Sequence, residues 1–458
     1  MEETFLSMLS EFLERAAGNA GITIKECEAL LDAVPGFTDK HDMKDTRAFL
    51  EYLGLPGDDL KIIHVAGTNG KGSVCSYISS VLVQADYTVG MFTSPHLVKL
   101  SERFAVDGKP ISDGVFVEVF VETLRRIREY STDYFPTYFE FLFFVAMILY
   151  DVYPVDYLIL ETGLGGRLDA TNSVTSPVLS IITEIGFDHM EYLGDSIEKI
   201  ALEKAGIIKR NVPVVFYDRR KESSDVIRKR AAECVARAVP VEGSSITDIR
   251  MLTDDAGNKS IAFSYESLYY KYVDLQVSTR ARYQAMNAAV AVAALEVLRD
   301  GGAVITEDDI RKGLLGARWD GRMEEMRPGI YVDGAHNLDG VEAFLESASF
   351  IETEGRKILL FGIVTDKEYR QIAEMILTSR EFDAIYVSAL ETKRSVSISE
   401  LKAAFEDAGE KLGIISPPIR YYSNVRDAVT DIITLRKVGD TVFAAGSLYL
   451  VGQIKQVL

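Results

Sequence analysis

Short apolar runs alternate with helical stretches along most of this chain. Residues 61–66 are apolar without helical periodicity, a pattern that predicts a buried strand. A glycine-rich turn at 67–72 follows, then residues 73–85 show the periodicity of a helix, and a second strand is predicted over 88–93. This strand–helix–strand unit predicts a parallel sheet with helices packed on its faces.

The same alternation continues as far as residue 300. It predicts helices around 11–15 and over 43–53, 139–150, 197–208 and 284–299, and strands over 157–160, 178–183 and 214–217. Residues 219–259 are polar, charged and weakly periodic, so we expect them at the periphery of the first domain.

A second, smaller set of alternating elements follows a break in the pattern. Glycines at 301–302 and the segment 313–320 interrupt the periodicity, and we place a domain boundary near residue 316. Beyond it the pattern predicts strands over 329–332, 357–361, 384–387, 420–422 and 441–445, and helices over 338–350, 367–378, 399–408 and 424–435. We therefore predict an α/β chain with a first domain over 1–316, which includes N-terminal helices, and a smaller, doubly wound, Rossmann-like domain over 317–458.

Composition agrees with a globular protein of two domains. The chain has 458 residues, of which 47% are hydrophobic and 26% charged, a balance unlike that of disordered chains. Its formal net charge of −19 disfavours nucleic acid and anionic membranes as partners. That charge does not forbid a local basic pocket for a small anion.

Cysteine usage and the length of the apolar runs indicate a cytoplasmic protein. Cys27, Cys75 and Cys234 are scattered without a Cys-x-x-Cys motif, which indicates neither a disulfide framework nor a zinc site. The longest apolar run, residues 141–150, is about half as long as a membrane-spanning helix. The Met-Glu-Glu start lacks the basic and apolar regions of a signal peptide.

The turn after the first predicted strand has the chemistry of a phosphate-binding loop. Its sequence is Gly67-Thr68-Asn69-Gly70-Lys71-Gly72-Ser73. Glycines let backbone N–H groups point at an anion, and the helix N-terminus adds partial positive charge. Lys71 can reach terminal phosphates and Ser73 can ligate Mg²⁺, although Gly72 between them makes the match to Gly-x₄-Gly-Lys-[Ser/Thr] imperfect. A plain strand-to-helix turn is the alternative, but the context favours nucleotide phosphates and predicts a P-loop ATPase domain.

Polar residues follow several predicted strands, where open parallel sheets bind their ligands. Glu161 ends one strand and offers a carboxylate for Mg²⁺, with a solvated strand end as the alternative. Three histidines also follow strands, which favours a ligand site over a plain surface position; they are His96, His189 and His336. By position alone, Lys204 is a surface lysine near a helix C-terminus.

Several segments, in the same order, resemble the folylpolyglutamate and dihydrofolate synthases of the Mur ligase superfamily. They are residues 67–73, 94–97, 161–172, 203–207, 284–287, 319–322, 333–337 and 446–448. The resemblance extends from about residue 61 to the C-terminus. Each motif alone is weak, but together they are specific.

That resemblance implies an ATP-dependent amide ligase. In such a reaction ATP phosphorylates a carboxylate, and the amine of L-glutamate attacks the resulting acyl phosphate. The implied partners are ATP, L-glutamate and a folate or dihydropteroate, and the implied cofactor is Mg²⁺, as two ions. We expect a monomer that adds glutamate to tetrahydrofolate, with dihydrofolate synthase activity on dihydropteroate as a second activity left open.

The resemblance also assigns roles by position in the first domain. It implies that the ATP phosphates are bound by Thr68, Asn69, Gly70, Lys71, Gly72 and Ser73, and that Mg²⁺ is bound by Ser73, Ser94, Glu161 and His189. The implied catalytic residues are Lys71, His189 and Lys204. Lys204 resembles a lysine that is carbamylated in the family, a change that turns a cation into a carboxylate-like group able to face a metal ion.

The remaining implied contacts involve both domains. The ATP site is completed by Asn287, Arg322, Asp333 and His336, and the pteridine-bearing substrate is bound by Thr137, Tyr138, Phe139, Glu140, Leu168, Asp169 and Ala170. Because Arg322, Asp333 and His336 follow the boundary, we expect ATP in an interdomain cleft that closes on ligand binding. From Phe141 onward we expect core packing instead of substrate contacts.

One segment departs from the family pattern. Where the family often has Lys-x-Gly-Leu-x-Arg before the first strand, this chain has Lys40-His41-Asp42-Met43-Lys44-Asp45, with acidic residues at the glycine and arginine positions. Since the region helps to shape the pterin end of the site, the departure bears on the acceptor more than on the ATP chemistry.

Two other functions stay open. A UDP-muropeptide amino-acid ligase of the same superfamily is disfavoured, because residues 168–172 are a folate-branch feature and no UDP-binding domain is evident in the first sixty residues. A non-catalytic nucleotide-binding protein would keep Lys71 but would not need Glu161, His189 and Lys204 together. Phosphate release that requires both a pteroate compound and glutamate separates the three.

Overall fold

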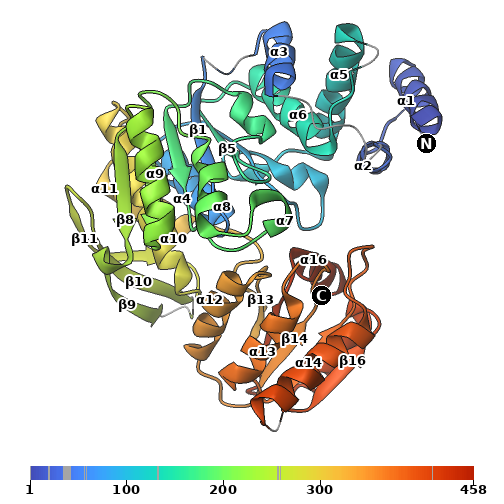
Figure 1. Cartoon of the computed structure of the whole chain (residues 1–458), viewed down its shortest axis with the longest axis vertical. Helices are drawn as coiled ribbons and strands as arrows, with labels where there is room; N and C mark the ends of the chain where they lie inside the picture. Colours follow the sequence, from blue (N-terminus) through green and yellow to red (C-terminus); the bar gives the residue numbers. More distant parts are fainter. Residues whose placement is uncertain are drawn as a thin grey trace. The chain divides into compact units, whose positions relative to one another are not determined.

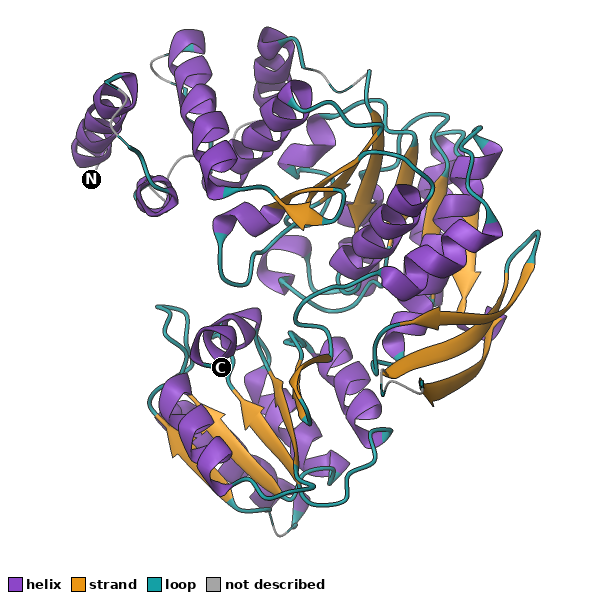
Figure 2. Cartoon of the chain, turned by 180° about the vertical axis from the view of Figure 1, so that it is seen from behind, coloured by secondary structure: helices purple, strands orange, loops and turns teal. Residues whose placement is uncertain are grey.

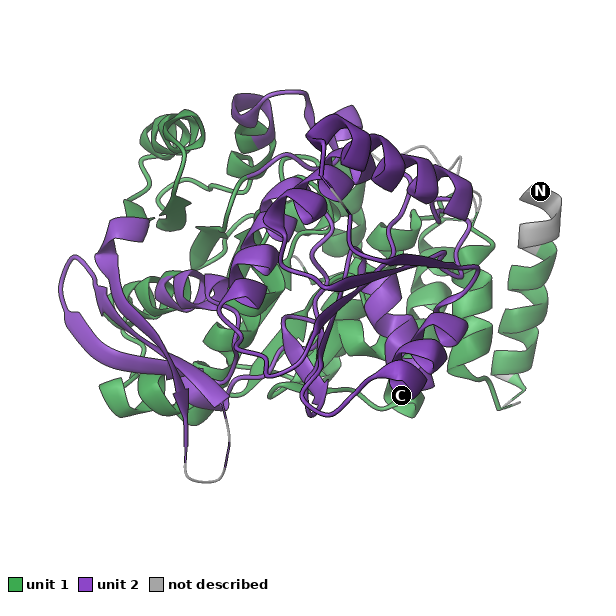
Figure 3. Ribbon diagram, turned by 90° about the horizontal axis from the view of Figure 1, so that it is seen from below, with its two compact units in different colours: residues 1–185, 201–242, 290–313 green, residues 186–200, 243–289, 314–458 purple. Residues whose placement is uncertain are grey.

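The protein forms two compact units (Figure 3). The computed structural model describes residues 2–458 except 19–20, 35–42, 56, 58, 132–133, 255–256, 258 and 415. The first unit comprises residues 1–185, 201–242 and 290–313, and the second comprises 186–200, 243–289 and 314–458. These units group segments by their proximity in space, and the boundary near residue 316 stays a prediction.

The first unit is built on a mostly parallel sheet with the strand order β4-β3-β2-β5-β1-β6-β7-β8 (Figure 1). Its strands are β1 (Lys61–Ala66), β2 (Val89–Phe92), β3 (Phe104–Val106), β4 (Lys109–Pro110), β5 (Tyr157–Glu161), β6 (Leu179–Ile182), β7 (Val214–Asp218) and β8 (Ala238–Glu242). Strand β3 pairs antiparallel with both neighbours. The predicted strands are confirmed, since continuous apolar runs are what a sheet covered on both faces buries.

Helices in the first three hundred residues match most of the predicted ones. They are α1 (Glu2–Ala17), α2 (Ile24–Asp32), α3 (Met43–Leu53), α4 (Lys71–Gln84), α5 (Asp113–Tyr130), α6 (Tyr138–Val152), α7 (Met190–Leu193), α8 (Ile197–Ala205), α9 (Lys221–Glu233), α10 (Tyr283–Asp300) and, further on, α11 (Glu307–Gly316). Short 3-10 helices cover Leu100–Arg103, Ala170–Ser173 and Gly243–Ser245. Residues 141–150 of α6 are buried in an apolar core with Phe49 and Phe120, so the expected core packing is confirmed.

The second unit contains a smaller doubly wound sheet with the order β12-β13-β17-β14-β15-β16. Its elements are β12 (Glu324–Arg327), β13 (Ile330–Val332), α12 (Leu338–Ser349), β14 (Lys357–Phe361), α13 (Tyr369–Ser379), β15 (Ala384–Ser388), α14 (Ile398–Leu412), β16 (Ile419–Tyr422), α15 (Val425–Leu435), β17 (Thr441–Ala445) and α16 (Leu448–Val457). Only the β12–β13 pair is antiparallel among the pairs described in this sheet. The predicted α/β fold is therefore found in both units.

The prediction for residues 219–259 is partly wrong. This polar stretch contains α9 and β8, which completes the edge of the first sheet, and then β9 (Ile246–Thr253). Strand β9 pairs antiparallel with β10 (Lys259–Glu266), which pairs with β11 (Lys271–Val277) (Figure 2). These strands belong to the second unit. Their exposed polar faces weaken the apolar signal on which the prediction depended.

Two boundaries also differ from the prediction. Helix α4 begins at Lys71 instead of 73, because Gly70 with φ +84° serves as its N-cap. The segment 313–320, predicted as a break, continues α11 to Gly316. Gly313 lies there because a Cβ atom would come within 2.5 Å of the Cα atom of Val81, so its role is close packing. Along the described residues, no helix has the length and apolar character needed to cross a membrane.

Candidate active site

The phosphate loop lies where β1 ends and is held against the end of β6. The N–H group of Thr68 donates to the carbonyl of Glu184 at 2.7 Å, and Thr183 Oγ1 donates to the carbonyl of Asn69 at 2.7 Å. A Cβ atom at Gly67, whose φ is +156°, would lie 1.8 Å from Thr183 Oγ1. Glycine is therefore required at that position, and the hydrogen bonds fix the loop against the residues that follow β6.

Lys71 stands over this loop at the start of α4. Its Nζ atom donates to the carbonyls of Gly67 at 3.1 Å and Thr68 at 3.3 Å. The same atom lies 3.9 Å from Glu161 Oε1. A cation, a helix N-terminus and a carboxylate are thus brought together, as phosphate binding with a divalent ion requires.

Glu161 has the properties of a metal ligand. It is the last residue of β5 and is 3% exposed, and its Oε2 atom accepts the N–H of Ser94 at 3.1 Å. Ser73 is buried in the first turn of α4. No cluster of three or more His, Cys, Asp or Glu side chains suited to a metal ion occurs among the described residues. One carboxylate and one hydroxyl nevertheless fit Mg²⁺, which keeps several waters and phosphate oxygens as ligands.

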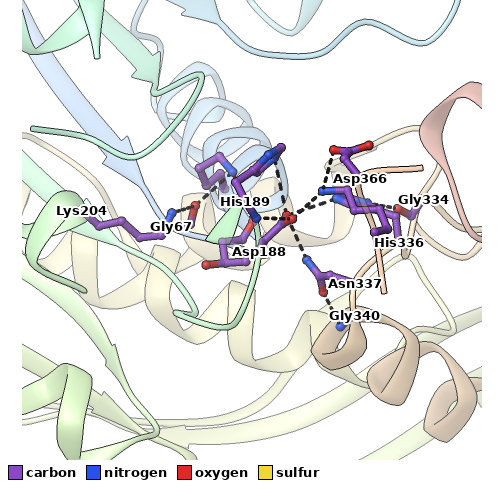
Figure 4. Close-up of polar contacts among 12 residues, drawn as sticks. Gly67, Asp188, His189, Lys204, Gly334, His336, Asn337, Gly340 and Asp366 are labelled. Atoms are coloured by element: carbon purple, nitrogen blue, oxygen red, sulfur yellow. Dashed lines mark hydrogen bonds and ion pairs between the residues drawn. The ribbon is translucent and has the colours of Figure 1, made fainter. Parts of the chain in front are cut away.

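Lys204 reaches the same loop from α8. Its buried side chain donates from Nζ to the carbonyl of Gly67 at 2.8 Å (Figure 4), the carbonyl that also accepts from Lys71. Two ammonium groups thus converge on one oxygen atom. Two residues further on, a Cβ atom at Gly206 would lie 2.4 Å from the Cβ atom of Arg167, so the end of α8 packs closely on the loop that contains Arg167.

In the second unit, several polar side chains contact the carboxylate of Asp188. Its carboxylate is paired with Lys367, whose side chain is 4% exposed, and it accepts from Asn337 Nδ2 at 3.3 Å. The His336 Nε2 atom lies 3.5 Å from Asp188 Oδ2, and the N–H of His189 donates to Asp188 Oδ1 at 2.9 Å (Figure 4). Asp188, Asn337 and Lys367 were not predicted as site residues from the sequence. The first two directly neighbour predicted histidines, and this proximity was the available signal.

Burial and charge set the protonation of this cluster. Burial opposes ionisation of Asp188, but the hydrogen bond from His336 and the charge of Lys367 outweigh it and hold the pKa of Asp188 far below its usual value. Burial lowers the pKa of His189 to about 4. At neutral pH His189 is therefore an uncharged imidazole, the form that can ligate a metal ion.

The other residues implied for ATP binding occur around Asp333, at the end of β13. Its carboxylate accepts from Tyr283 OH at 2.5 Å and from the N–H groups of Met323 at 2.9 Å and Ala335 at 2.8 Å. Burial raises the pKa of Asp333, against the nearby charge of Arg322. Tyr283 was also not predicted from the sequence. It is the first residue of α10, the helix that contains the predicted Asn287.

Arg322, His336 and Asn287 have local hydrogen bonds in the second unit. Arg322 Nη1 donates to the carbonyl of Gly321 at 3.3 Å, and His336 Nδ1 lies 2.7 Å from the carbonyl of Gly334. Asn287 Nδ2 donates to Gln284 Oε1 at 3.0 Å. A Cβ atom at Gly334 would lie 2.1 Å from Arg322 Nη1, so glycine leaves room for this guanidinium.

The segment implied for the pteridine substrate begins α6. Thr137 and Glu140 form a capping box, in which the Thr137 N–H donates to Glu140 Oε2 at 2.8 Å. The ring of Phe139 lies 2.6 Å from where a Cβ atom of Gly163 would be. Tyr138 faces the guanidinium of Arg103 at 5.8 Å. Thr137 and Glu140 therefore shape the helix start, whereas the rings of Tyr138 and Phe139 are partly buried against the apolar core.

The second implied segment has one exposed residue and two buried ones. Asp169 is committed to its own loop, since its carboxylate accepts the N–H groups of Gly163 and Leu164, both at 2.9 Å. Ala170 is buried, whereas Leu168 is 44% exposed and free to contact a ligand. Of the divergent segment 40–45, residues 40–42 lie outside the described residues.

Comparisons with known proteins agree with this geometry. Residues 65–295 match the Mur ligase middle domain, and residues 321–448 match the Mur ligase glutamate ligase domain. The chain is 34% identical over 413 residues to dihydrofolate synthase/folylpolyglutamate synthase of Bacillus subtilis (strain 168), which covers 89% of this chain and 92% of that relative.

Solved structures give the same result. Mycobacterium tuberculosis folylpolyglutamate synthase complexed with ADP and AMPPCP has a TM-score of 0.81 and 28% identity, over 95% of this chain and 98% of that one. Escherichia coli FolC in complex with DHPP and ADP has a TM-score of 0.81 and 27% identity, over the same shares. The fold and the matched domains define a Mur ligase. Within that class, the chain belongs to the folylpolyglutamate synthase/dihydrofolate synthase family of ATP-dependent ligases.

Proposed function

We propose that this protein adds L-glutamate to tetrahydrofolate and its glutamylated forms, at the expense of ATP. The observation that carries the proposal is the group of Gly67, Lys71, Glu161 and Lys204, which is joined by hydrogen bonds and by the ion pair of Lys71 with Glu161. We assign residues 1–316 to ATP binding and 317–458 to the glutamate ligase part, in agreement with the matched domains. Dihydrofolate synthase activity on dihydropteroate is a second activity, favoured by the names of the Bacillus subtilis relative and the DHPP complex.

The proposed chemistry has two steps. A carboxylate oxygen of the folate attacks the γ-phosphorus of ATP, ADP leaves, and an acyl phosphate forms. The amine of glutamate then attacks the acyl carbon, inorganic phosphate leaves, and the amine proton passes to solvent or a nearby base. Such a reaction needs positioning and charge neutralisation more than covalent help from the protein.

The residues of the first unit would neutralise the phosphates. Backbone N–H groups from Thr68 to Ser73 would cradle them, with Lys71 at the terminal phosphate. Ser73, Ser94 and Glu161 are the proposed oxygen ligands of two Mg²⁺ ions, with His189 as a nitrogen ligand. Bound Mg²⁺ would offset the charge that moves from the γ-phosphate to ADP.

Lys204 is the proposed site of a carbamate. Its ammonium group would first lose a proton, and the neutral amine would then attack CO₂ and lose a second proton, so that a cation becomes an anion. The nearby Lys71 supports this change, because the two side chains share the Gly67 carbonyl and their repulsion disappears when one becomes anionic. The carbamate would then face the Mg²⁺ ions and Lys71.

The second unit would hold the nucleoside and the rest of the phosphate charge. Asp333 would accept from ribose hydroxyls and Arg322 would bind phosphate with its planar fork, while Asn287 and His336 would complete the contacts. The acceptor would contact Tyr138, Phe139 and Leu168, with Thr137, Glu140, Asp169 and Ala170 shaping those surfaces.

A substrate panel tests the proposal. ATP, Mg²⁺ and glutamate are supplied with tetrahydrofolate, dihydropteroate or a UDP-muropeptide, and the product is identified by its mass. We expect a glutamate adduct and stoichiometric phosphate with the folate compounds alone. A muropeptide adduct would favour the cell-wall ligase, and nucleotide binding without any adduct would favour a non-catalytic protein. Gel filtration with light scattering checks the proposed monomer.

A further inference from the structure

A cavity of about 390 Å³ lies in the second unit, and its lining includes none of the residues assigned above. It is lined by β9 and β10, by the segment before α10 and by residues just after α12 (Figure 1). Its volume is in the range of sites that bind small molecules. Among the described residues, none of the proposed ATP, metal or folate ligands lines it.

The wall of this cavity is basic on a strongly acidic chain. Arg250, Arg280 and Arg282 line it, and Glu352 is the acidic residue among its lining. The whole chain carries a net charge of −19. A concave surface of the opposite sign focuses its field into the cavity, where it attracts small anions.

The guanidinium N–H groups of Arg280 are available to donate hydrogen bonds to a ligand in the cavity. Its guanidinium carbon lies 5.6 Å from the centre of the Tyr331 ring, which supports it from one side. Within the described residues, its side chain has no hydrogen bond and no ion pair. A guanidinium carries five N–H donors in a planar fork that matches carboxylate and phosphate oxygens.

The other two arginines are partly neutralised and form the sides. Arg282 stacks on Phe350 at 4.0 Å and lies 3.5 Å from a carboxylate oxygen of Glu346. Arg250 Nη2 lies 2.7 Å from Asp274 Oδ1, but both side chains are about half exposed, so the pair is weak. Phe350 itself is 47% exposed and offers an apolar face beside the guanidinium groups.

We propose that this cavity binds a small polyanion through carboxylate or phosphate oxygens, with Arg280 as its principal contact. Carboxylates could come from an oligoglutamate chain and phosphates from a nucleotide or a polyphosphate. Both kinds of group present oxygen atoms that the planar guanidinium fork of Arg280 can bind. This binding does not depend on the proposed ligase activity.

Isothermal titration calorimetry of the full chain at low salt tests the proposal. The probes are γ-linked triglutamate and inorganic tripolyphosphate, each without Mg²⁺ or ATP. We expect Arg280→Gln to weaken binding of at least one probe about tenfold or more, as the loss of a charge-assisted contact requires. Arg280→Lys keeps the charge without the fork and should give an intermediate affinity. Arg426→Gln, an exposed position on α15, makes the same charge change and should bind as the unmodified chain does.

A second variant distinguishes binding in the cavity from binding at the phosphate loop. Lys71→Ala should retain the binding component that Arg280→Gln removes. Response to triglutamate alone identifies carboxylate as the ligand chemistry, and response to tripolyphosphate alone identifies phosphate. Equal affinity of Arg280→Gln and the unmodified chain for both probes overturns the proposal, as does an absence of binding at millimolar concentrations. Thermal unfolding of both Arg280 variants shows whether the fold is intact.

Discussion

The Nζ atom of Lys204 and the carbonyl oxygen of Gly67 are 2.8 Å apart, although 137 residues separate them along the chain. The hydrogen bond joins the end of α8 to the first residue of the phosphate loop. Lys71 donates to the same carbonyl at 3.1 Å. Two lysines that share one acceptor repel each other as cations, and this is the physical reason to test Lys204 for a carbamate.

Lys204→Ala should reduce ligation by about a hundredfold or more, because the anion proposed to face the metal ions is lost. Short carboxylates such as acetate should restore part of the activity by occupying the vacated space. The measurement is ADP release with and without added acetate. Lys199→Ala on the same helix is the control, since Lys199 forms an exposed pair with Asp195. A fully active Lys204→Ala enzyme would remove the carbamate from the mechanism.

Lys71→Ala should lower turnover by roughly a hundredfold to a thousandfold, the usual cost of losing a donor to charge in the transition state. The unfolding temperature should change little, because Lys71 loses two hydrogen bonds to backbone carbonyls and one long ion pair with Glu161, at 3.9 Å. Lys61→Ala at the opposite end of β1 is the control and should stay active. Steady-state phosphate release decides the matter, and normal turnover in the Lys71 variant contradicts the phosphate-loop assignment.

The sequence predicted the parallel sheets and the phosphate loop because their signals are local. Runs such as 61–66 and 441–445 are buried on both faces, and Gly67, Gly70 and Lys71 lie within one turn. It could not predict Lys367 beside Asp188, since that pair joins segments 179 residues apart. The three-stranded sheet was missed for a related reason, as β9 has few buried positions.

The family resemblance implied roles for Lys204 and Asp169, and the structure shows which contacts their side chains make. From its position in the sequence alone, Lys204 was expected to be a surface lysine, whereas the family resemblance implied a catalytic role. In the structure its side chain is buried and contacts the phosphate loop. Conversely, Asp169 was implied as a substrate contact, whereas its carboxylate is occupied by Gly163 and Leu164. These hydrogen bonds give Asp169 a role in shaping the loop, and its contact with the substrate stays a prediction.

Gly206→Ala should reduce both stability and activity. The new Cβ atom would lie 2.4 Å from the Cβ atom of Arg167, so the loop would have to move away from α8, at about 1–3 kcal/mol. Because Lys204 is two residues away, its contact with Gly67 should be disturbed as well. Gly21→Ala is the control, since nothing lies within 4 Å of its added Cβ atom. Equal denaturation midpoints for the two variants would contradict this explanation of the glycine.

Acid should destabilise the protein through His64. This residue is fully buried on β1, and burial lowers its pKa from 6.5 to about 3. Between pH 6.5 and about 3, His64 takes up a proton in the unfolded chain but not in the folded one. The stability that the uncharged imidazole contributes is therefore complete above pH 6.5 and falls as the pH is lowered. The slope from this one group is about 1.4 kcal/mol per pH unit.

His64→Gln should remove that slope while keeping a donor for Thr171, which lies 2.8 Å from the imidazole Nε2 atom. Urea unfolding of both proteins at several pH values from 4 to 6.5 gives the comparison. The curves of stability against pH should converge as the pH falls, because the variant loses less. Parallel curves would show that His64 does not titrate differently in the two states.

Asp188→Asn should lower the free energy of unfolding by about 3–5 kcal/mol, because the buried ammonium of Lys367 loses its nearer partner and keeps the longer contact with Asp366, at 3.8 Å. The pKa of Asp188 is held far below its usual value, so the carboxylate contributes fully at neutral pH, and the difference between the proteins should shrink only on acidification below pH ~4. Asp195→Asn, at an exposed carboxylate, is the control.

The double variant Asp188→Asn/Lys367→Met gives the sharper test of the same pair. Removing the cation together with its partner leaves no uncompensated charge, so this protein should be more stable than Asp188→Asn alone. Urea unfolding of the two single variants and the double variant completes the cycle. Additive losses would mean that the two side chains do not interact, and that the other neighbours of Asp188, Asn337 and His336, hold the carboxylate by themselves.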